Sequence, residues 1–139
     1  MSQPFEEGRT ADPGTLTRAL PGAPLAYLEG ALANPTLSAE HLLLCLRNPA
    51  AAAPFIARLC RNATWLKSYD VKAAIVLHPR TPRAAAMNLV AFLWWRDLAR
   101  VSDRAALAPS LRRTAERLLA IRVQELALGE RIALARIAG

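Results

Sequence analysis

The segment that most constrains the fold of this chain runs from His78 to Arg100, HPRTPRAAAMNLVAFLWWRDLAR. Two prolines stand near its start, and its positions from Ala84 to Leu93 are almost wholly apolar, with no charge between Arg83 and Arg96. A helix that is apolar on every side is buried on every side. We therefore expect this segment to form a central helix with other helices packed around it.

The composition favours helices along the whole chain. Of the 139 residues, 53% are hydrophobic and 21% are charged, which is typical of a globular domain large enough to bury a core. The apolar residues are mostly Ala and Leu, and only 6% of the residues are aromatic. Ala and Leu are good helix formers, and runs that favour strands are nearly absent. The sequence therefore predicts an all-α fold.

A short motif that ends in Asn recurs at intervals of 14 residues, at Asn34, Asn48 and Asn62. Pro follows the first two, and His78-Pro79 repeats the pattern further on. Fourteen residues hold about ten residues of helix and four of turn. Asn tolerates the left-handed conformation that ends a helix, and Pro cannot continue one. Short helices joined by polar turns predict a short right-handed α-solenoid (α-α superhelix) of stacked helical hairpins, with about 7–8 helices.

The helical-repeat domain is expected to span residues 24–139. Residues 1–23 contain Pro and Gly without a helical period, which predicts a flexible N-terminal arm. A helix is expected from Pro24 to about Ala33, and Ser68 is a candidate N-cap for another. Pro109 opens an amphipathic helix whose apolar stripe comprises Leu111, Ala115, Leu118, Leu119 and Val123.

A last helix is expected from Glu130 to Ala138, after Gly129. Its apolar residues Ile132, Leu134 and Ala135 have no obvious neighbour within the chain. We expect this helix either to fold back as a cap or to mediate self-association with another copy.

With these units defined, the chain resembles HEAT-like and leucine-rich-repeat-variant α-helical repeat proteins. The likeness is carried by the turns Asn34-Pro35, Asn48-Pro49 and His78-Pro79. The segment from His78 to Arg100, followed by LRRTAERLL and LGERIALAR, is also similar to a group of uncharacterised bacterial helical-repeat proteins. The resemblance covers about residues 31–139, although the repeat spacing is irregular. It implies partner binding and no catalytic residues.

The sequence lacks the usual signatures of catalysis. No Gly-rich phosphate loop or nucleophile elbow is present. The residues Cys45 and Cys60 align with apolar positions of the neighbouring units, so we expect core positions for them. Together with His41 and His78 they are too few to predict a metal site. We therefore expect no enzyme activity, no cofactor and no metal.

Membrane insertion and secretion are not predicted. The longest uncharged run, residues 84–95, has twelve residues, whereas a membrane span needs about 20. No basic region followed by an apolar core is visible at the N-terminus. We therefore expect a soluble, cytoplasmic protein.

The chain carries a net charge of +7, and 16 of its 18 basic residues are Arg. An Arg excess is typical of phosphate and nucleic-acid binding. A GC-rich coding bias produces the same excess without any function. If the charge is functional, the residues that would bind nucleic acid are Arg80, Arg83, Arg96, Arg100, Arg112, Arg113 and Arg117. Acidic residues are interleaved with them, which favours a protein partner instead.

The candidate partner-binding residues are Trp94, Trp95, Arg96 and Arg100. Trp beside Arg is a common combination at protein interfaces. Consecutive residues on a helix point about 100° apart, so the two tryptophans cannot face the same core surface. We expect at least one to be partly exposed; the alternative is that both are buried. The main hypothesis is therefore a scaffold that binds an unidentified protein or peptide.

Nucleic-acid binding is the alternative function. A third hypothesis is activity like that of HEAT-like DNA glycosylases, because aromatics beside Asp97 resemble a site that stacks a flipped base.

Overall fold

The computed structural model describes residues 2–138, apart from the side chains at positions 134, 135, 137 and 138. These residues form nine α-helices and two short 3₁₀ helices without a strand, so the all-α prediction is confirmed and the predicted number of 7–8 helices was slightly low. The elements are α1 (Gln3–Thr10), α2 (Pro13–Ala19), η1 (Leu20–Gly22), α3 (Leu25–Leu32), α4 (Ala39–Arg47), α5 (Ala53–Cys60), η2 (Trp65–Lys67), α6 (Tyr69–Leu77), α7 (Arg83–Val90), α8 (Trp95–Asp103) and α9 (Pro109–Ala138).

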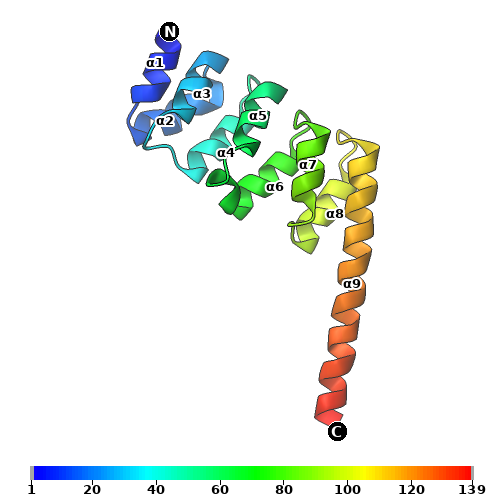
Figure 1. Cartoon of the computed structure of the whole chain (residues 1–139). Coiled ribbons are helices and arrows are strands. Elements are labelled where there is room, and N and C mark those ends of the chain that lie inside the picture. The colour runs from blue at the N-terminus through cyan, green and yellow to red at the C-terminus, as the bar shows by residue number, and fades with distance from the viewer. Residues whose placement is uncertain (1, 139) are drawn as a thin grey trace.

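The helices follow one another in a row from α1 at one end to α9 at the other (Figure 1). Several helices two places apart in the sequence pack together: α1 on α3, α2 on α4, α4 on α6, α6 on α8, and α7 on α9. The consecutive helices α6 and α7 also pack together, as do α8 and α9. One cluster of buried side chains runs through the row from Leu16 to Ala115. Because the row is thin, most helices have one face in the core and another in solvent.

Residues 1–23 contain two helices, so the prediction that they lack helical structure was wrong. Helix α1 lies directly against α3. A Cβ atom at Gly8 would overlap the carbonyl oxygen of Tyr27, and one at Gly30 would overlap that of Phe5. The two glycines therefore permit the backbones to touch. No local pattern shows this contact, because it depends on one glycine from each of two separate helices.

The buried asparagines of the repeat bind to the ends of earlier helices. The Nδ2 group of Asn34 donates to the carbonyl oxygens of Gly8 and Ala11, at 3.0 and 2.7 Å. Its Oδ1 accepts from the backbone N–H of Thr36 at 2.9 Å. Asn34 is 5% exposed, so these hydrogen bonds are shielded from water. The side chain connects its own turn to the end of α1.

Asn48 makes the same contacts one unit later. Its Nδ2 donates to the carbonyl oxygens of Leu20 and Ala23, at 2.7 and 2.8 Å, and its Oδ1 accepts from Ala50 N–H at 2.8 Å. Residues 2–138 contain no residue with positive φ, so the expected left-handed conformation of these asparagines was wrong. Asn suits these two turns because its carboxamide both donates and accepts.

The two other turn positions differ from these asparagines. Asn62 is exposed, and its Oδ1 accepts from Thr64 N–H at 3.0 Å within its own turn. His78 occupies the same turn position as Asn48, because its Nδ1 accepts from the N–H two residues on, that of Arg80, at 3.1 Å. Arg80 then donates to the carbonyl oxygens of Pro49 and Ala51. A His and an Arg together therefore replace the single carboxamide.

The segment from His78 to Arg100 is not one central helix, so that prediction was wrong. Helix α7 ends at Val90, and α8 begins only at Trp95. Ala86 and Leu89 are buried, as expected, but Ala84, Asn88 and Phe92 are among the exposed residues of the segment. The apolar run is rich in Ala, which is small enough to stand on a solvent face at little cost. The absence of charge therefore did not imply burial.

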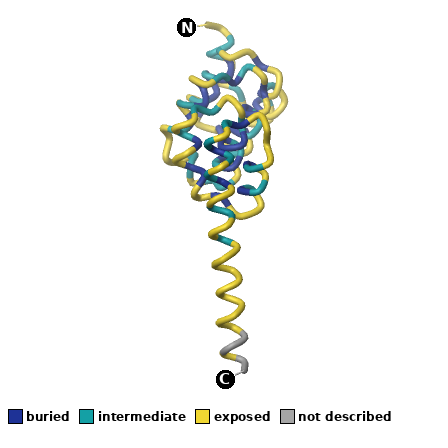
Figure 2. Tube along the Cα trace, turned by 90° about the vertical axis from the view of Figure 1, so that its right-hand side faces the viewer, coloured by how far each residue is buried: buried dark blue, intermediate teal, exposed yellow. Residues whose placement is uncertain are grey.

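The C-terminal residues belong to one 30-residue helix, α9, which passes through Gly129 without a break. The separate helix predicted after Gly129 is therefore wrong. Leu111 and Ala115 in the first turns are buried, and Leu118 and Leu119 are half-buried. Val123, predicted to complete this stripe, is 56% exposed. Beyond it α9 extends away from the other helices, as Figure 2 shows. The side chains of Leu134 and Ala135 lie outside the described residues.

Substitution of the buried repeat asparagine tests whether its hydrogen bonds stabilise the fold. We expect Asn48→Ala to lower the free energy of unfolding by about 2–4 kcal/mol, because two carbonyl oxygens lose a buried donor. The matched control, Asn62→Ala, occupies the same repeat position on the surface and should lower it by less than about 1 kcal/mol. Urea unfolding followed by circular dichroism measures both, and equal effects would contradict this role.

A second pair of substitutions tests the one-sided burial of α7. Ala86→Asp or Leu89→Asp places an unpaired charge in the core, and the penalty approaches the total stability of about 5–15 kcal/mol for a domain. We expect both variants to be unfolded. Met87→Asp in the same helix, at a position 37% exposed, should melt within a few degrees of the unmodified protein. If all three variants unfold, α7 is buried on every side after all.

Candidate partner-binding sites

Three large aromatic side chains are exposed at the connection from α7 to α8. Phe92 is 62%, Trp94 63% and Trp95 51% exposed, and we call these residues the aromatic cluster. The prediction that at least one tryptophan is partly exposed is confirmed, and in fact both are. The geometric reason given for it fails, however, because Trp94 is the extended N-cap residue of α8 and not part of a helix.

Trp94 is held in place by the first residue of α6. The rings of Trp94 and Tyr69 are stacked, with centroids 3.9 Å apart and planes 12° from parallel. The backbone N–H of Trp94 donates to the Tyr69 hydroxyl at 2.9 Å, and that hydroxyl donates to the carboxylate of Asp97. Burial and the hydrogen bond to Asp97 raise the pKa of Tyr69, so it keeps its proton at neutral pH. The exposed indole is therefore fixed before any partner arrives.

Cationic side chains surround the aromatic cluster. The Lys72 ammonium lies 5.2 Å from the Phe92 ring centroid, and the Arg96 guanidinium lies 5.4 Å from that of Trp95. A depression of about 420 Å³ is lined by Trp94, Trp95, Arg96 and Arg122. Arg122, from α9, donates to the carbonyl oxygens of Leu93 and Ala91 at 2.8 and 3.0 Å. These contacts attach α9 to the connection that carries the cluster.

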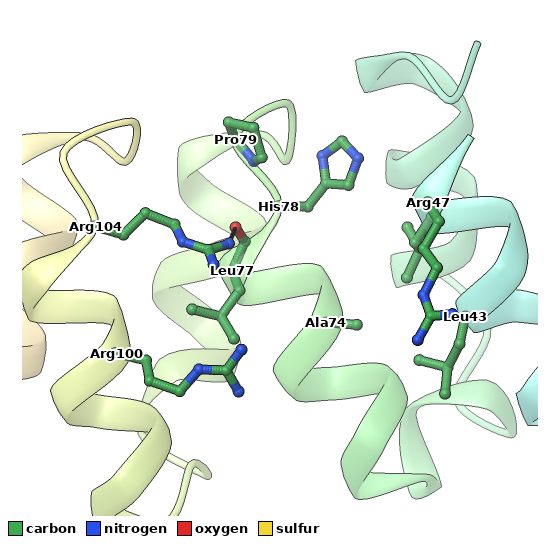
Figure 3. A pocket seen from close by; sticks show the side chains of 9 residues that line it. Leu43, Arg47, Ala74, Leu77, His78, Pro79, Arg100 and Arg104 are labelled. Atoms are coloured by element: carbon green, nitrogen blue, oxygen red, sulfur yellow. Dashed lines mark hydrogen bonds between the residues drawn. The ribbon is translucent and has the colours of Figure 1, made fainter. Parts of the chain in front are cut away.

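A second depression, of about 490 Å³, lies between α4, α6 and α8 (Figure 3). Its apolar part comes from α4 and α6, and its charged part comes from arginines at the C-terminal ends of α4 and α8. The lining residues are Leu43, Leu46, Arg47, Ala74, Leu77, His78, Pro79, Arg100 and Arg104. We call this hollow the basic depression, because three arginines and no carboxylate line it.

Arg100 was predicted to lie with Trp94 and Trp95, whereas the structure places it at the basic depression. Arg47 and Arg104 were not predicted. These two arginines are 57 residues apart in the chain, and only the packing of α4, α6 and α8 brings them to one site. A signal was present, because Arg47 is the last residue of α4 and Arg104 directly follows α8. Basic residues are favoured at helix C-termini for electrostatic reasons alone, so that signal is weak.

The structure places the arginines of the nucleic-acid hypothesis in different surroundings. Arg96 and Arg100 line two different depressions. Arg80 binds backbone carbonyls, and the Arg100 guanidinium pairs with Asp97 at 3.0 Å. The remaining four are Arg83 at the start of α7 and Arg112, Arg113 and Arg117 near the start of α9.

The histidines and cysteines have structural surroundings. His41 is buried in the capping box of α4, where its Nδ1 accepts from Ser38 N–H at 3.0 Å. Burial raises the pKa of the Cys45 thiol to about 12, and burial also raises the pKa of the half-buried Cys60. A protonated thiol is a poor nucleophile and metal ligand. Within the described part of the chain, no group of three or more His, Cys, Asp or Glu side chains is placed to hold a metal ion.

Comparison with known proteins found no match for this chain among protein-family models, curated proteins or solved structures. Among residues 2–138, no helix combines the length and the apolar character needed to cross a membrane.

The pH dependence of stability tests the role of His78 at the basic depression. Burial, the largest cause, and nearby Arg80 lower the pKa of His78 below the ordinary value of 6.5. As the pH falls, His78 is therefore protonated in the unfolded chain at a higher pH than in the folded protein. The stability that neutral His78 contributes is lost below about pH 6.5. In His78→Asn, which introduces the residue found at the other turns, this loss should be absent.

Melting temperatures of the two proteins between pH 8 and pH 5 measure the effect. We expect the unmodified protein to lose more stability than His78→Asn, because the two proteins differ only at position 78. Parallel curves would contradict a neutral, half-buried His78.

Proposed function

We propose that this protein is a non-catalytic helical-repeat scaffold, a short right-handed α-solenoid of the HEAT-like or leucine-rich-repeat-variant kind, which binds a protein or peptide partner. The packing of helices two places apart and the recurring asparagine contacts support the repeat architecture. The single observation that carries the binding function is the aromatic cluster. Large apolar side chains grouped on a surface and rimmed by cations are typical of protein-binding sites.

The arrangement of the cluster suits a binding function. Trp and Arg are the residues that contribute most at protein interfaces, and here Arg96 and Arg122 border Trp94 and Trp95. Binding usually costs free energy because exposed side chains lose their mobility. Because Trp94 is stacked on Tyr69, its side chain has already lost most of this mobility in the folded protein. A partner therefore gains the buried area of the Trp94 indole at little further entropy cost.

Nucleic-acid binding is the second candidate, favoured by the net charge of +7. Against it, several arginines already have internal roles. Arg80 and Arg122 donate to backbone carbonyls. Glycosylase-like activity has less support, because Asp97 is engaged by both Tyr69 and Arg100 instead of facing a substrate site.

The test compares partner capture from an extract of the native host by the unmodified protein and by Trp94→Ala and Trp95→Ala. We expect at least one of the two to reduce the amount of the main partner tenfold or more, the effect of losing about 1.4 kcal/mol. Leu126→Ala on α9, with a similar exposure of 59%, is the matched control and should capture normally. Melting curves establish that each variant folds.

Identical partner sets for both tryptophan variants and the unmodified protein would refute the role of the aromatic cluster. If the protein instead binds DNA with an affinity that falls steeply with salt, and the tryptophan variants bind equally well, the nucleic-acid hypothesis replaces it.

A further inference from the structure

The basic depression has an apolar floor that is open to solvent. Helix α6 lies between α4 and α8; its Ala74 lies toward Leu43 of α4, and its Leu77 lies toward Arg100 and Arg104 of the α8 side (Figure 3). Ala74 and Leu43 are only half-buried. Because Ala74 ends at its Cβ atom, the middle of the floor stays hollow. The volume of about 490 Å³ accommodates several side chains of a bound segment.

The walls of this depression are positively charged on both sides. Arg47 stands on the α4 side, and Arg100 and Arg104 stand on the α8 side. Arg47 has no ion-pair partner among the residues that the structure describes. The Nη1 group of Arg104 donates to the Leu77 carbonyl oxygen at 3.0 Å, which fixes that guanidinium beside the floor. Each guanidinium has five N–H donors, so donors remain for a ligand.

Neutralising groups are scarce at this site. The Arg100 side chain is 60% exposed and shares one donor with Asp97, which does not line the depression. The lowered pKa of His78 keeps its ring neutral at neutral pH, so it neither adds to nor offsets the charge. The site therefore offers three guanidinium groups around an apolar floor and no carboxylate. The complementary ligand carries carboxylates beside an apolar side chain.

The extent of the basic surface distinguishes a peptide from a nucleic acid. Along the same face, the neighbouring depression between α2 and α4 is lined by Thr17, Glu40, Leu43, Leu44 and Arg47. On the α4 side, the surface thus changes from basic to mixed and apolar within one helix. A nucleic acid presents a continuous line of phosphates and binds to an extended basic surface. A short basic site beside leucines instead matches a few carboxylates and a nearby apolar residue.

We infer that the basic depression is a docking site for an acidic peptide segment of a partner protein, rich in Asp and Glu and carrying an apolar residue for the floor. This inference deepens the proposed function and rests on it, but it assigns a second contact surface, separate from the aromatic cluster. The guanidinium groups of Arg47, Arg100 and Arg104 bind the carboxylates, and the hollow above Ala74 receives the apolar side chain.

The experiment measures fluorescence polarisation of a labelled peptide of alternating Glu and Leu residues. Two further probes of equal length are a peptide with Lys in place of Glu and a single-stranded oligonucleotide. We expect saturable binding of the acidic peptide alone, weakening as salt is raised. Arg47→Glu should reduce its affinity at least tenfold, and Ala74→Leu, which fills the hollow, should also reduce it. Arg61→Glu makes the same change of charge at an exposed residue outside the depression and should reduce it less than threefold.

Several results would overturn the docking site. The first is that the acidic peptide shows no saturable binding up to about 1 mM. The second is that Arg47→Glu and Arg61→Glu reduce its affinity equally. The third is that the oligonucleotide binds more tightly than the acidic peptide and that its binding depends on Arg47. Trp95→Ala should leave binding of the acidic peptide unchanged. Loss of partner capture in Trp95→Ala together with failure of the peptide experiment would thus overturn the docking site and leave the proposed function in place.

Discussion

The structure depends on how the row of helices satisfies the carbonyl groups at helix ends. The last carbonyls of a helix have no partner within it, and short helices have many such ends relative to their length. In this protein, side chains from later units donate to them: Asn34 to the end of α1, and Asn48 to Leu20 and Ala23 around η1. Each such hydrogen bond joins two segments that are adjacent in space but more than twenty residues apart in the chain. It therefore satisfies a carbonyl group and also holds the two segments against each other.

Arginine takes over this task in the C-terminal half. Arg80 donates to the turn after α4, Arg104 to the last residue of α6, and Arg122 to the connection after α7. A long planar donor group reaches carbonyls across a wider gap than a carboxamide does. Part of the arginine content is therefore structural, which weakens the argument from net charge to nucleic acid. Three arginines surround the basic depression, and one of them, Arg104, also has this structural role.

Asp97 connects the two candidate binding surfaces. One of its oxygens accepts from Tyr69, on which Trp94 is stacked, and the other accepts from Arg100, which lines the basic depression. Helix α8 thus contributes Trp95 and Arg96 to one surface and Arg100 to the other. A partner that occupied both would contact neighbouring parts of one rigid helix, so neither contact would require the protein to change shape.

By itself the sequence determined the features that depend on local chemistry. The abundance of Ala and Leu determined an all-helical chain, the spacing of Asn34 and Asn48 located two turns, and the alignment of Cys45 with an apolar position identified a buried residue. The tertiary structure decided the rest. Residues 3–10 have a local helix signal in the N-cap Ser2, but their packing against α3 depended on Gly8 and Gly30. Which residues of the uncharged run before Trp94 are buried depended on which of its faces contacts a neighbouring helix. Arg47 and Arg104 share a site only because α4, α6 and α8 lie side by side. Periodicity records which residues share a face of one helix, but contacts between distant helices leave no period to detect.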